Sequence, residues 1–211
     1  MGIDTALSPQ IDLATEPRWT RFYGTFGESP ELDTDMARAY VDGFQTSTGK
    51  AEIADGWGYN SVNAMVKHWP SGGPEEGGRD AHYNYGKYAV YPGGAFETHL
   101  KPFTEGAFKL NGATGMASAV MPYYTISTGV DPSGKNVGNS FSKNIITDLL
   151  REKYGYDGVV CTDWNITYDN AGIDKFDGQC WGVEELTVAQ RHYEWLKAGV
   201  DQFGGNNDNW T

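Results

Sequence analysis

Short apolar runs alternate with longer helical patterns along this chain of 211 residues, and that alternation constrains the fold more than any other feature. The predicted strands are residues 11–14, 62–66, 115–121, 156–161 and 199–203, and the predicted helices are residues 31–45, 95–110, 140–154 and 184–197. Such alternation favours an α/β fold built on a parallel sheet. We count about four to five strand–helix units, whereas a closed eight-unit barrel needs about 250 residues. We therefore expect either part of such a barrel or a small α/β domain with long loops.

Two of the predicted helices carry more specific expectations. In helix 31–45, the apolar side chains spaced for one buried face are Leu32, Met36, Ala39, Tyr40 and Phe44. Helix 140–154 is expected to begin with Ser140 as its cap and to end at Gly155.

The composition limits the partners of the chain. The net charge is −12 with no basic cluster, so we expect no nucleic-acid partner. No apolar run is long enough to span a bilayer, so no membrane partner is expected either. The 7 tryptophans, 13 tyrosines and 28 glycines suit a loop-rich enzyme or a carbohydrate-binding protein. The sequence leaves a homo-oligomer and the cellular compartment open. Cys161 is expected to be a buried apolar side chain, and a disulfide to Cys180 stays an alternative.

A carboxylate and an indole follow the apolar run Val159-Val-Cys161. In a parallel array, the end of this strand opens onto the face where active sites form. Asp163 there can attack or stabilise an anomeric carbon, and Trp164 can stack on the apolar face of a sugar ring. The alternative is that Asp163 caps the next helix or turn and that Trp164 is ordinary packing.

Other polar side chains also follow predicted strands. Arg21 can form a fork of hydrogen bonds to neighbouring hydroxyls, or a salt bridge to a nearby glutamate. Lys67 and His68 can bind sugar hydroxyls, or be a solvated lysine and a turn histidine. Tyr124 can donate a hydrogen bond to a carboxylate, or pack with its hydroxyl in water. Because the ends of parallel strands converge on one face, we expect these side chains to meet around Asp163.

The long polar stretch 70–94 is predicted to be a functional loop. Its glycine-rich part, residues 71–78, lacks the Gly-Lys-Ser/Thr ending of a phosphate loop and carries two glutamates, so we exclude nucleotide binding there. Asp80 and His82, two residues apart, can form a dyad in which the carboxylate orients the imidazole, or belong to a plain surface loop. The four histidines show no metal-ligand spacing, so we expect no metal and no organic cofactor.

Four stretches, taken in order, resemble glycoside hydrolase family 3. They are Glu16-Pro-Arg-Trp-Thr-Arg21, Phe26-Gly-Glu-Ser-Pro30, Lys67-His-Trp-Pro-Ser-Gly-Gly-Pro74 and Gly155-Tyr-Asp-Gly-Val-Val-Cys-Thr-Asp-Trp164. The likeness runs from about residue 8 to residue 208. It implies a (β/α)8 TIM-barrel-like glycosidase domain that is incomplete here: residues 1–211 form a single α/β domain that lacks the first strands of the barrel and the domain that follows it.

The resemblance also implies residue roles. It makes Asp163 the nucleophile of a retaining enzyme and Trp164 part of the next sugar subsite. Arg21, Lys67 and His68 then bind the hydroxyls of the innermost sugar, and Tyr124 lies near the nucleophile. The implied partner is a carbohydrate substrate.

The chain departs from the family pattern in several places. Thr20 replaces a usual glycine, Trp69 a phenylalanine and Ser71 a glycine. An upstream sugar-binding aspartate has no match, and the usual acid/base glutamate belongs to a following domain. Asp80 and His82 fit the dyad that serves as acid/base in the β-N-acetylglucosaminidase branch.

We therefore expect a retaining exo-acting β-glycosidase of the β-glucosidase type that forms a covalent glycosyl-enzyme on Asp163. Two alternatives remain: a non-catalytic or inactive sugar-binding fragment, and a β-N-acetylglucosaminidase that uses Asp80 and His82.

Overall fold

A parallel five-stranded sheet in the order β1-β4-β6-β8-β9 forms the centre of the molecule. The structure is a computed structural model that describes residues 2–170, 172 and 178–205. The strands of the central sheet are β1 (Thr5–Ala6), β4 (Asn63–Trp69), β6 (Ala119–Pro122), β8 (Val159–Trp164) and β9 (Gln202–Gly204). Two small sheets pair β2 (Glu52–Ala54) with β3 (Trp57–Gly58), and β5 (Tyr88–Ala89) with β7 (Ile126–Ser127).

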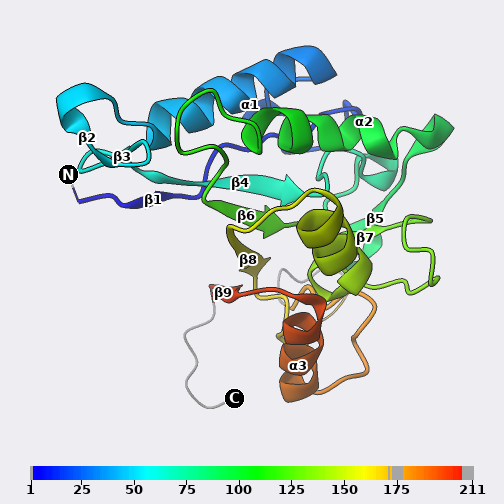
Figure 1. Cartoon of the computed structure of the whole chain (residues 1–211). Helices are drawn as coiled ribbons and strands as arrows, with labels where there is room; N and C mark the ends of the chain where they lie inside the picture. Colours follow the sequence, from blue (N-terminus) through cyan, green and yellow to red (C-terminus); the bar gives the residue numbers. More distant parts are fainter. Residues whose placement is uncertain (1, 171, 173–177, 206–211) are drawn as a thin grey trace.

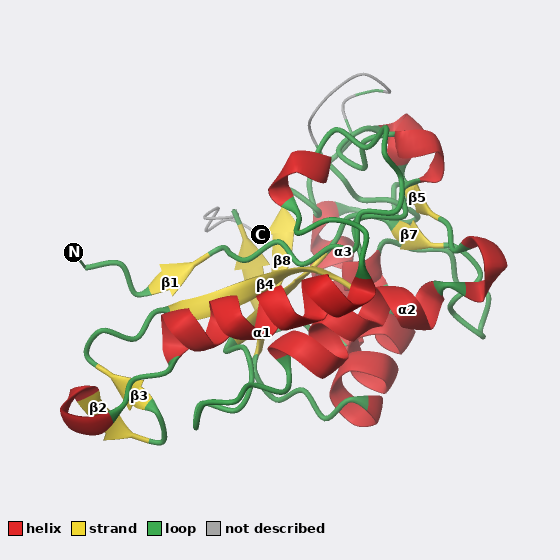
Figure 2. Cartoon of the chain, turned by 90° about the horizontal axis from the view of Figure 1, so that it is seen from above, coloured by secondary structure: helices red, strands yellow, loops and turns green. Residues whose placement is uncertain are grey.

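The helices pack around this sheet (Figure 1). They are α1 (Pro30–Gln45), α2 (Phe96–Lys101), α3 (Val188–Ala198) and two π-helical segments, Pro102–Ala107 and Asn144–Lys153. In Figure 1, α1 and α2 lie at one end of the stack of strands and α3 at the other; Figure 2 shows the same α1 running alongside β4. The predicted α/β fold with a parallel sheet is confirmed, and over the described residues it forms a half-barrel.

Side chains alternate between the two faces of the central sheet. Val66, Val120 and Val160 are fully buried and belong to the main core. The residues on either side of these valines point the opposite way, because successive residues of a strand face opposite sides. They form a second, small cluster of Met65, Ala119, Met121 and Cys161, against which Trp164 packs. Lys67 and Asp163 come two residues after members of this cluster, so the polar side chains continue the same face.

The predicted buried face of α1 is wrong. Leu32, Met36 and Tyr40 are exposed, whereas the buried residues are Asp33, Thr34, Ala37, Val41 and Gln45. The cause is close contact between α1 and the π-helical segment Pro102–Ala107. A Cβ added at Gly106 would lie 2.7 Å from the Thr34 carbonyl oxygen and 3.2 Å from the Ala37 Cβ, so the segment can approach this side of α1 only because residue 106 is a glycine.

Several predicted boundaries also change. Residues 11–14 are buried but do not form a strand; Gln10 makes an isolated bridge to Lys67 instead. Helix 95–110 divides into α2 and a π-helical segment, where the Phe108 N–H donates to Phe103 five residues back.

The helix predicted for residues 140–154 begins at Asn144, and Ser142, not Ser140, accepts a hydrogen bond from the Ile145 N–H. Gly155 ends the segment with φ +67°. The last predicted helix is confirmed as α3, capped by Thr187 and Gln190.

The loop over residues 70–94 contains short 3₁₀ turns and β5, so it is more ordered than its composition indicates. Cys161 is buried as predicted, and the disulfide alternative is wrong because Cys161 and Cys180 are both free. Over the described part of the chain, no helix has the length and apolar character needed to cross a membrane.

Candidate active site

Asp163 lies near the carboxyl end of β8, inside the strand rather than after it. Only 7% of the residue is exposed. Its Oδ1 accepts a hydrogen bond of 2.8 Å from the Trp164 N–H, and its Oδ2 has no hydrogen-bond partner among the described residues. A carboxylate oxygen buried in this way keeps its acceptor capacity for a ligand.

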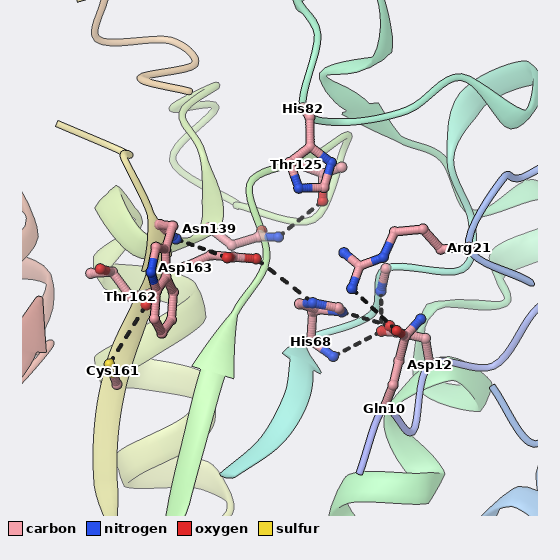
Figure 3. Close-up of polar contacts among 12 residues, drawn as sticks. Gln10, Asp12, Arg21, His68, His82, Thr125, Asn139, Cys161, Thr162 and Asp163 are labelled. Carbon is pink, nitrogen blue, oxygen red and sulfur yellow. Dashed lines mark hydrogen bonds and ion pairs between the residues drawn. The ribbon is translucent and has the colours of Figure 1, made fainter. Parts of the chain in front are cut away.

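His68 lies directly across from Asp163, as Figure 3 shows. It belongs to the end of β4, because that strand runs two residues beyond Lys67. The distance from His68 Nε2 to Asp163 Oδ2 is 3.7 Å, which is too long for a hydrogen bond. The ring is held from the side by Tyr123, whose centroid is 4.3 Å away.

Asp12 supports His68 from behind, and sequence reasoning missed it. This carboxylate is fully buried and lies in the extended segment before Arg21. Its Oδ2 contacts His68 Nδ1 at 2.7 Å, and its Oδ1 accepts from the His68 N–H at 2.9 Å and the Gly72 N–H at 2.5 Å. Burial raises the pKa of Asp12, but His68 and the Gly72 amide lower it more, so its pKa lies below the usual value. The one sequence feature that could have identified Asp12 is that it is a single acid inside the apolar run 11–14.

Two cations lie beside this pair. Arg21 donates to the Gln10 side chain at 3.2 Å and sits 5.8 Å from the centre of the Tyr123 ring. Burial lowers the pKa of Lys67, and the nearby charge of Arg21 lowers it further, while Asp163 and Asp12 oppose both. Burial also lowers the pKa of Arg21, but Tyr123, Asp12 and Asp163 together raise it above the usual value. Arg21 and Lys67 are therefore within electrostatic reach of Asp163.

Tyr124 and Trp164 complete the set of residues singled out in the sequence. Burial and then the charge of Asp163 raise the pKa of Tyr124, which places the phenol beside the carboxylate. Trp164 lies on the same strand as Asp163, and its ring is partly covered by Gly204 of β9. The structure thus brings all six of these residues to one end of the sheet, where the sequence predicted them.

The Asp80–His82 pair forms as predicted. Asp80 Oδ1 lies 2.6 Å from His82 Nδ1 and also accepts from the His82 N–H at 3.0 Å. Burial raises the pKa of Asp80, but the contacts with His82 lower it more, so the carboxyl is ionised. The His82 ring stands edge-on to Tyr124 with a centroid distance of 4.8 Å, so the dyad reaches the neighbourhood of Asp163.

The three departures from the family pattern all have partners in the structure. Thr20 donates to Asp80 Oδ2 at 3.3 Å. Trp69 is fully buried and donates to the Ile145 carbonyl at 3.0 Å. Ser71 is fully buried and contacts His99 Nδ1 at 2.9 Å. Each of the three substituted side chains therefore has a hydrogen-bond partner in this structure.

Two further buried groups were missed by sequence reasoning. Glu75 is 1% exposed, and burial raises its pKa to about 9; Tyr123 opposes this, and Asp80 adds to it. Tyr123 is also fully buried, and burial raises the pKa of its hydroxyl. No sequence signal distinguishes Glu75 from the exposed Glu76 beside it. In the described part of the chain, no cluster of three or more His, Cys, Asp or Glu side chains is placed to hold a metal ion.

Comparison with known proteins identifies the family that this chain matches. The profile of the Glycosyl hydrolase family 3 N terminal domain matches residues 1–202. The chain is 44% identical to Beta-glucosidase C of Emericella nidulans over 97% of this chain and 31% of that protein. It is also 44% identical to the Periplasmic beta-glucosidase/beta-xylosidase of Dickeya chrysanthemi over 99% of this chain and 32% of that protein. The chain therefore spans about a third of the length of these curated relatives.

Solved structures agree with the fold. A β-glucosidase from Erythrobacter marinus superposes with a TM-score of 0.70 at 25% identity, over 97% of this chain and 23% of that protein. A β-glucosidase from Listeria innocua in complex with isofagomine gives a TM-score of 0.67 at 23% identity, over 95% of this chain and 24% of that protein, and this second likeness bears on the fold alone.

Proposed function

The chain belongs to glycosyl hydrolase family 3, and from that premise we propose that it acts as a retaining exo-acting β-glycosidase of the β-glucosidase type. The observation that carries the proposal is the grouping of the buried His68 and the partly buried cations Arg21 and Lys67 near Asp163. The Oδ2 atom of Asp163 has no hydrogen-bond partner among the described residues. Donors and a ring nitrogen can hold the hydroxyls of one sugar there, while the carboxylate faces its anomeric carbon. The named relatives are β-glucosidases, or a β-glucosidase/β-xylosidase, which favours a β-linked glucoside as substrate.

The proposed reaction has two steps. Asp163 Oδ2 attacks the anomeric carbon as the bond to the leaving oxygen breaks, and a general acid protonates that oxygen. Water then displaces the carboxylate from the anomeric carbon, and the same acid/base group accepts its proton. The cations Arg21 and Lys67 lie within electrostatic reach of Asp163, so they can bind hydroxyls of the same sugar that Asp163 attacks. Trp164 is proposed to line the adjoining subsite.

Both steps of the proposed mechanism need an acid/base group. Within this chain, His82 is the candidate that geometry favours, because Asp80 orients it and its ring lies against Tyr124. We expect His82→Ala to lower turnover roughly 10²-fold or more if it serves as acid/base. Unchanged turnover in His82→Ala would assign the acid/base to another group.

The first test of the proposal is a substrate panel with a nucleophile variant. The hydrolysis rates of aryl β-glucoside, β-xyloside and N-acetyl-β-glucosaminide are measured with the chain and with a version extended at both ends. Asp163→Asn should lower turnover on the order of 10⁴-fold or more while sugar binding is partly kept, since only the attacking group is lost. Normal turnover in Asp163→Asn would contradict the assigned role. A preference for the N-acetylated substrate would favour the β-N-acetylglucosaminidase alternative.

A further inference from the structure

The contacts of Asp12 determine which nitrogen of His68 carries a proton. Both backbone N–H groups that bind Asp12, those of His68 and Gly72, donate to Oδ1. Oδ2 is left for His68 Nδ1 alone, at 2.7 Å. An ionised carboxylate can only accept hydrogen bonds, so the hydrogen atom in this contact must sit on Nδ1.

The other ring nitrogen then has no hydrogen. Burial lowers the pKa of His68 below its usual value even though Asp12 and Asp163 oppose this, so the ring is neutral at pH 7. A neutral imidazole that carries its hydrogen on Nδ1 presents a lone pair at Nε2. That lone pair faces Asp163 Oδ2 at 3.7 Å, and two acceptors at this separation do not bond to each other.

We propose that Asp12 is a positioning residue that fixes His68 as a hydrogen-bond acceptor, so that the innermost sugar must present a hydroxyl that donates to Nε2. This inference rests on the proposed function for its ligand, although the tautomer itself does not. A substrate group that can only accept, such as fluorine, leaves the lone pair of buried Nε2 unmatched and is rejected.

The variant Asp12→Asn separates this role from a structural one. The amide oxygen keeps both backbone N–H groups, and this fixes the orientation of the amide. Its NH₂ group then replaces Oδ2 and donates to Nδ1, which must give up its hydrogen. The hydrogen moves to Nε2, and His68 becomes a donor toward the sugar. Replacing the aspartate of a serine-protease triad by asparagine leads to the same wrong tautomer.

The matched control is Asp33→Asn. Asp33 is also a fully buried aspartate, and the charges of Asp33 and Asp12 interact. No hydrogen bond joins it to His68 among the described residues. The same chemical change at Asp33 therefore leaves the tautomer of His68 as it is in the unmodified chain.

The first experiment is ¹⁵N NMR of the imidazoles at pH 7, in a chain that has only four histidines to assign. We expect a protonated Nδ1 and an unprotonated Nε2 on His68 in the unmodified chain and in Asp33→Asn, and the reverse in Asp12→Asn. A protonated Nε2 in the unmodified chain overturns the proposal, and so does an unchanged tautomer in Asp12→Asn. If Asp12→Asn does not fold, the spectrum of the unmodified chain still decides.

The second experiment measures selectivity. Aryl β-glucosides with fluorine in place of the 3-, 4- or 6-hydroxyl are compared with the parent glucoside in the unmodified chain and in Asp12→Asn. At one position, the kcat/KM preference for hydroxyl over fluorine should fall roughly tenfold or more in Asp12→Asn, about the effect of one buried hydrogen bond. An equal preference in both proteins at every position overturns the acceptor role. Absence of turnover with all glucosides would instead refute the proposed function, while the NMR result stands.

Discussion

At the scale of single residues, the acids Asp12, Asp33 and Glu75 are all buried, and tertiary packing determines the surroundings of each one. Asp163, His68 and Lys67 follow predicted strands, and parallel strands bring such positions together, so their convergence could be predicted. Asp12 could not, because its partner His68 lies 56 residues away and the contact exists only after the strands align. The burial of Glu75 and Asp33 could not be predicted for the same reason, because burial of an acid depends on tertiary packing and not on the local sequence pattern.

Asp33 leads to a prediction about pH and stability. Both of its carboxylate oxygens lack a hydrogen-bond partner among the described residues, and burial, with Asp12, raises its pKa to about 8. The carboxyl of an unfolded aspartate has a pKa of about 4. Between about pH 4 and pH 8, the folded state therefore holds the Asp33 proton more tightly than the unfolded state does. The contribution to stability is fully present below about pH 4 and is lost as the pH rises through about 8.

We therefore expect the free energy of unfolding to fall by a few kcal/mol between about pH 4 and pH 8, and Asp33→Asn to remove the part due to this residue. Denaturant titrations of both proteins at pH 5, 7 and 9 measure this. Parallel pH profiles for the unmodified chain and Asp33→Asn would show that Asp33 is not a neutral acid in the folded state.

At the scale of elements, the position of α1 could be predicted, but its buried face could not. The apolar spacing of Leu32, Met36 and Tyr40 is helical, yet the helix turns this face outward. The face with Thr34 and Ala37 lies against Gly106, where a Cβ would come within 2.7 Å of the Thr34 carbonyl oxygen and 3.2 Å of the Ala37 Cβ. Close packing against the segment Pro102–Ala107 therefore outweighs the hydrophobicity of the opposite face. The sequence of α1 alone does not show that this segment packs against it.

Substitutions on the two faces of α1 should behave in opposite ways. Ala37→Leu adds volume against Gly106 and should destabilise the chain by about 1–3 kcal/mol. Leu32→Ala removes an apolar side chain that is 53% exposed and should change stability by about 0.5 kcal/mol or less. Thermal or denaturant unfolding compares the two. A larger loss of unfolding free energy in Leu32→Ala than in Ala37→Leu would show that the face predicted from the sequence is the buried one.

At the scale of the whole molecule, the described residues form a central five-stranded parallel sheet, and polar side chains gather at one end of it. The α/β class and the parallel sheet could be predicted from alternation alone, whereas strand ends shifted by a few residues, because Lys67 and Asp163 lie within strands. That residues 1–211 form a single partial domain, without the first barrel strands and the following domain, stays a prediction. Activity found only after extension at both ends would support it.

The account depends most on Asp163 as the nucleophile, and covalent trapping tests this directly. An aryl 2-deoxy-2-fluoro-β-glucoside has a good leaving group, and its fluorine slows hydrolysis of the glycosyl-enzyme by destabilising the oxocarbenium-like transition state. The compound is incubated with this chain and with the version extended at both ends, and proteolytic peptides are then weighed by mass spectrometry. We predict that the peptide containing Asp163 gains one fluoroglucosyl group, and that Asp163→Asn gains none. A fluoroglucosyl group on any other residue, or an unchanged adduct in Asp163→Asn, would contradict the account.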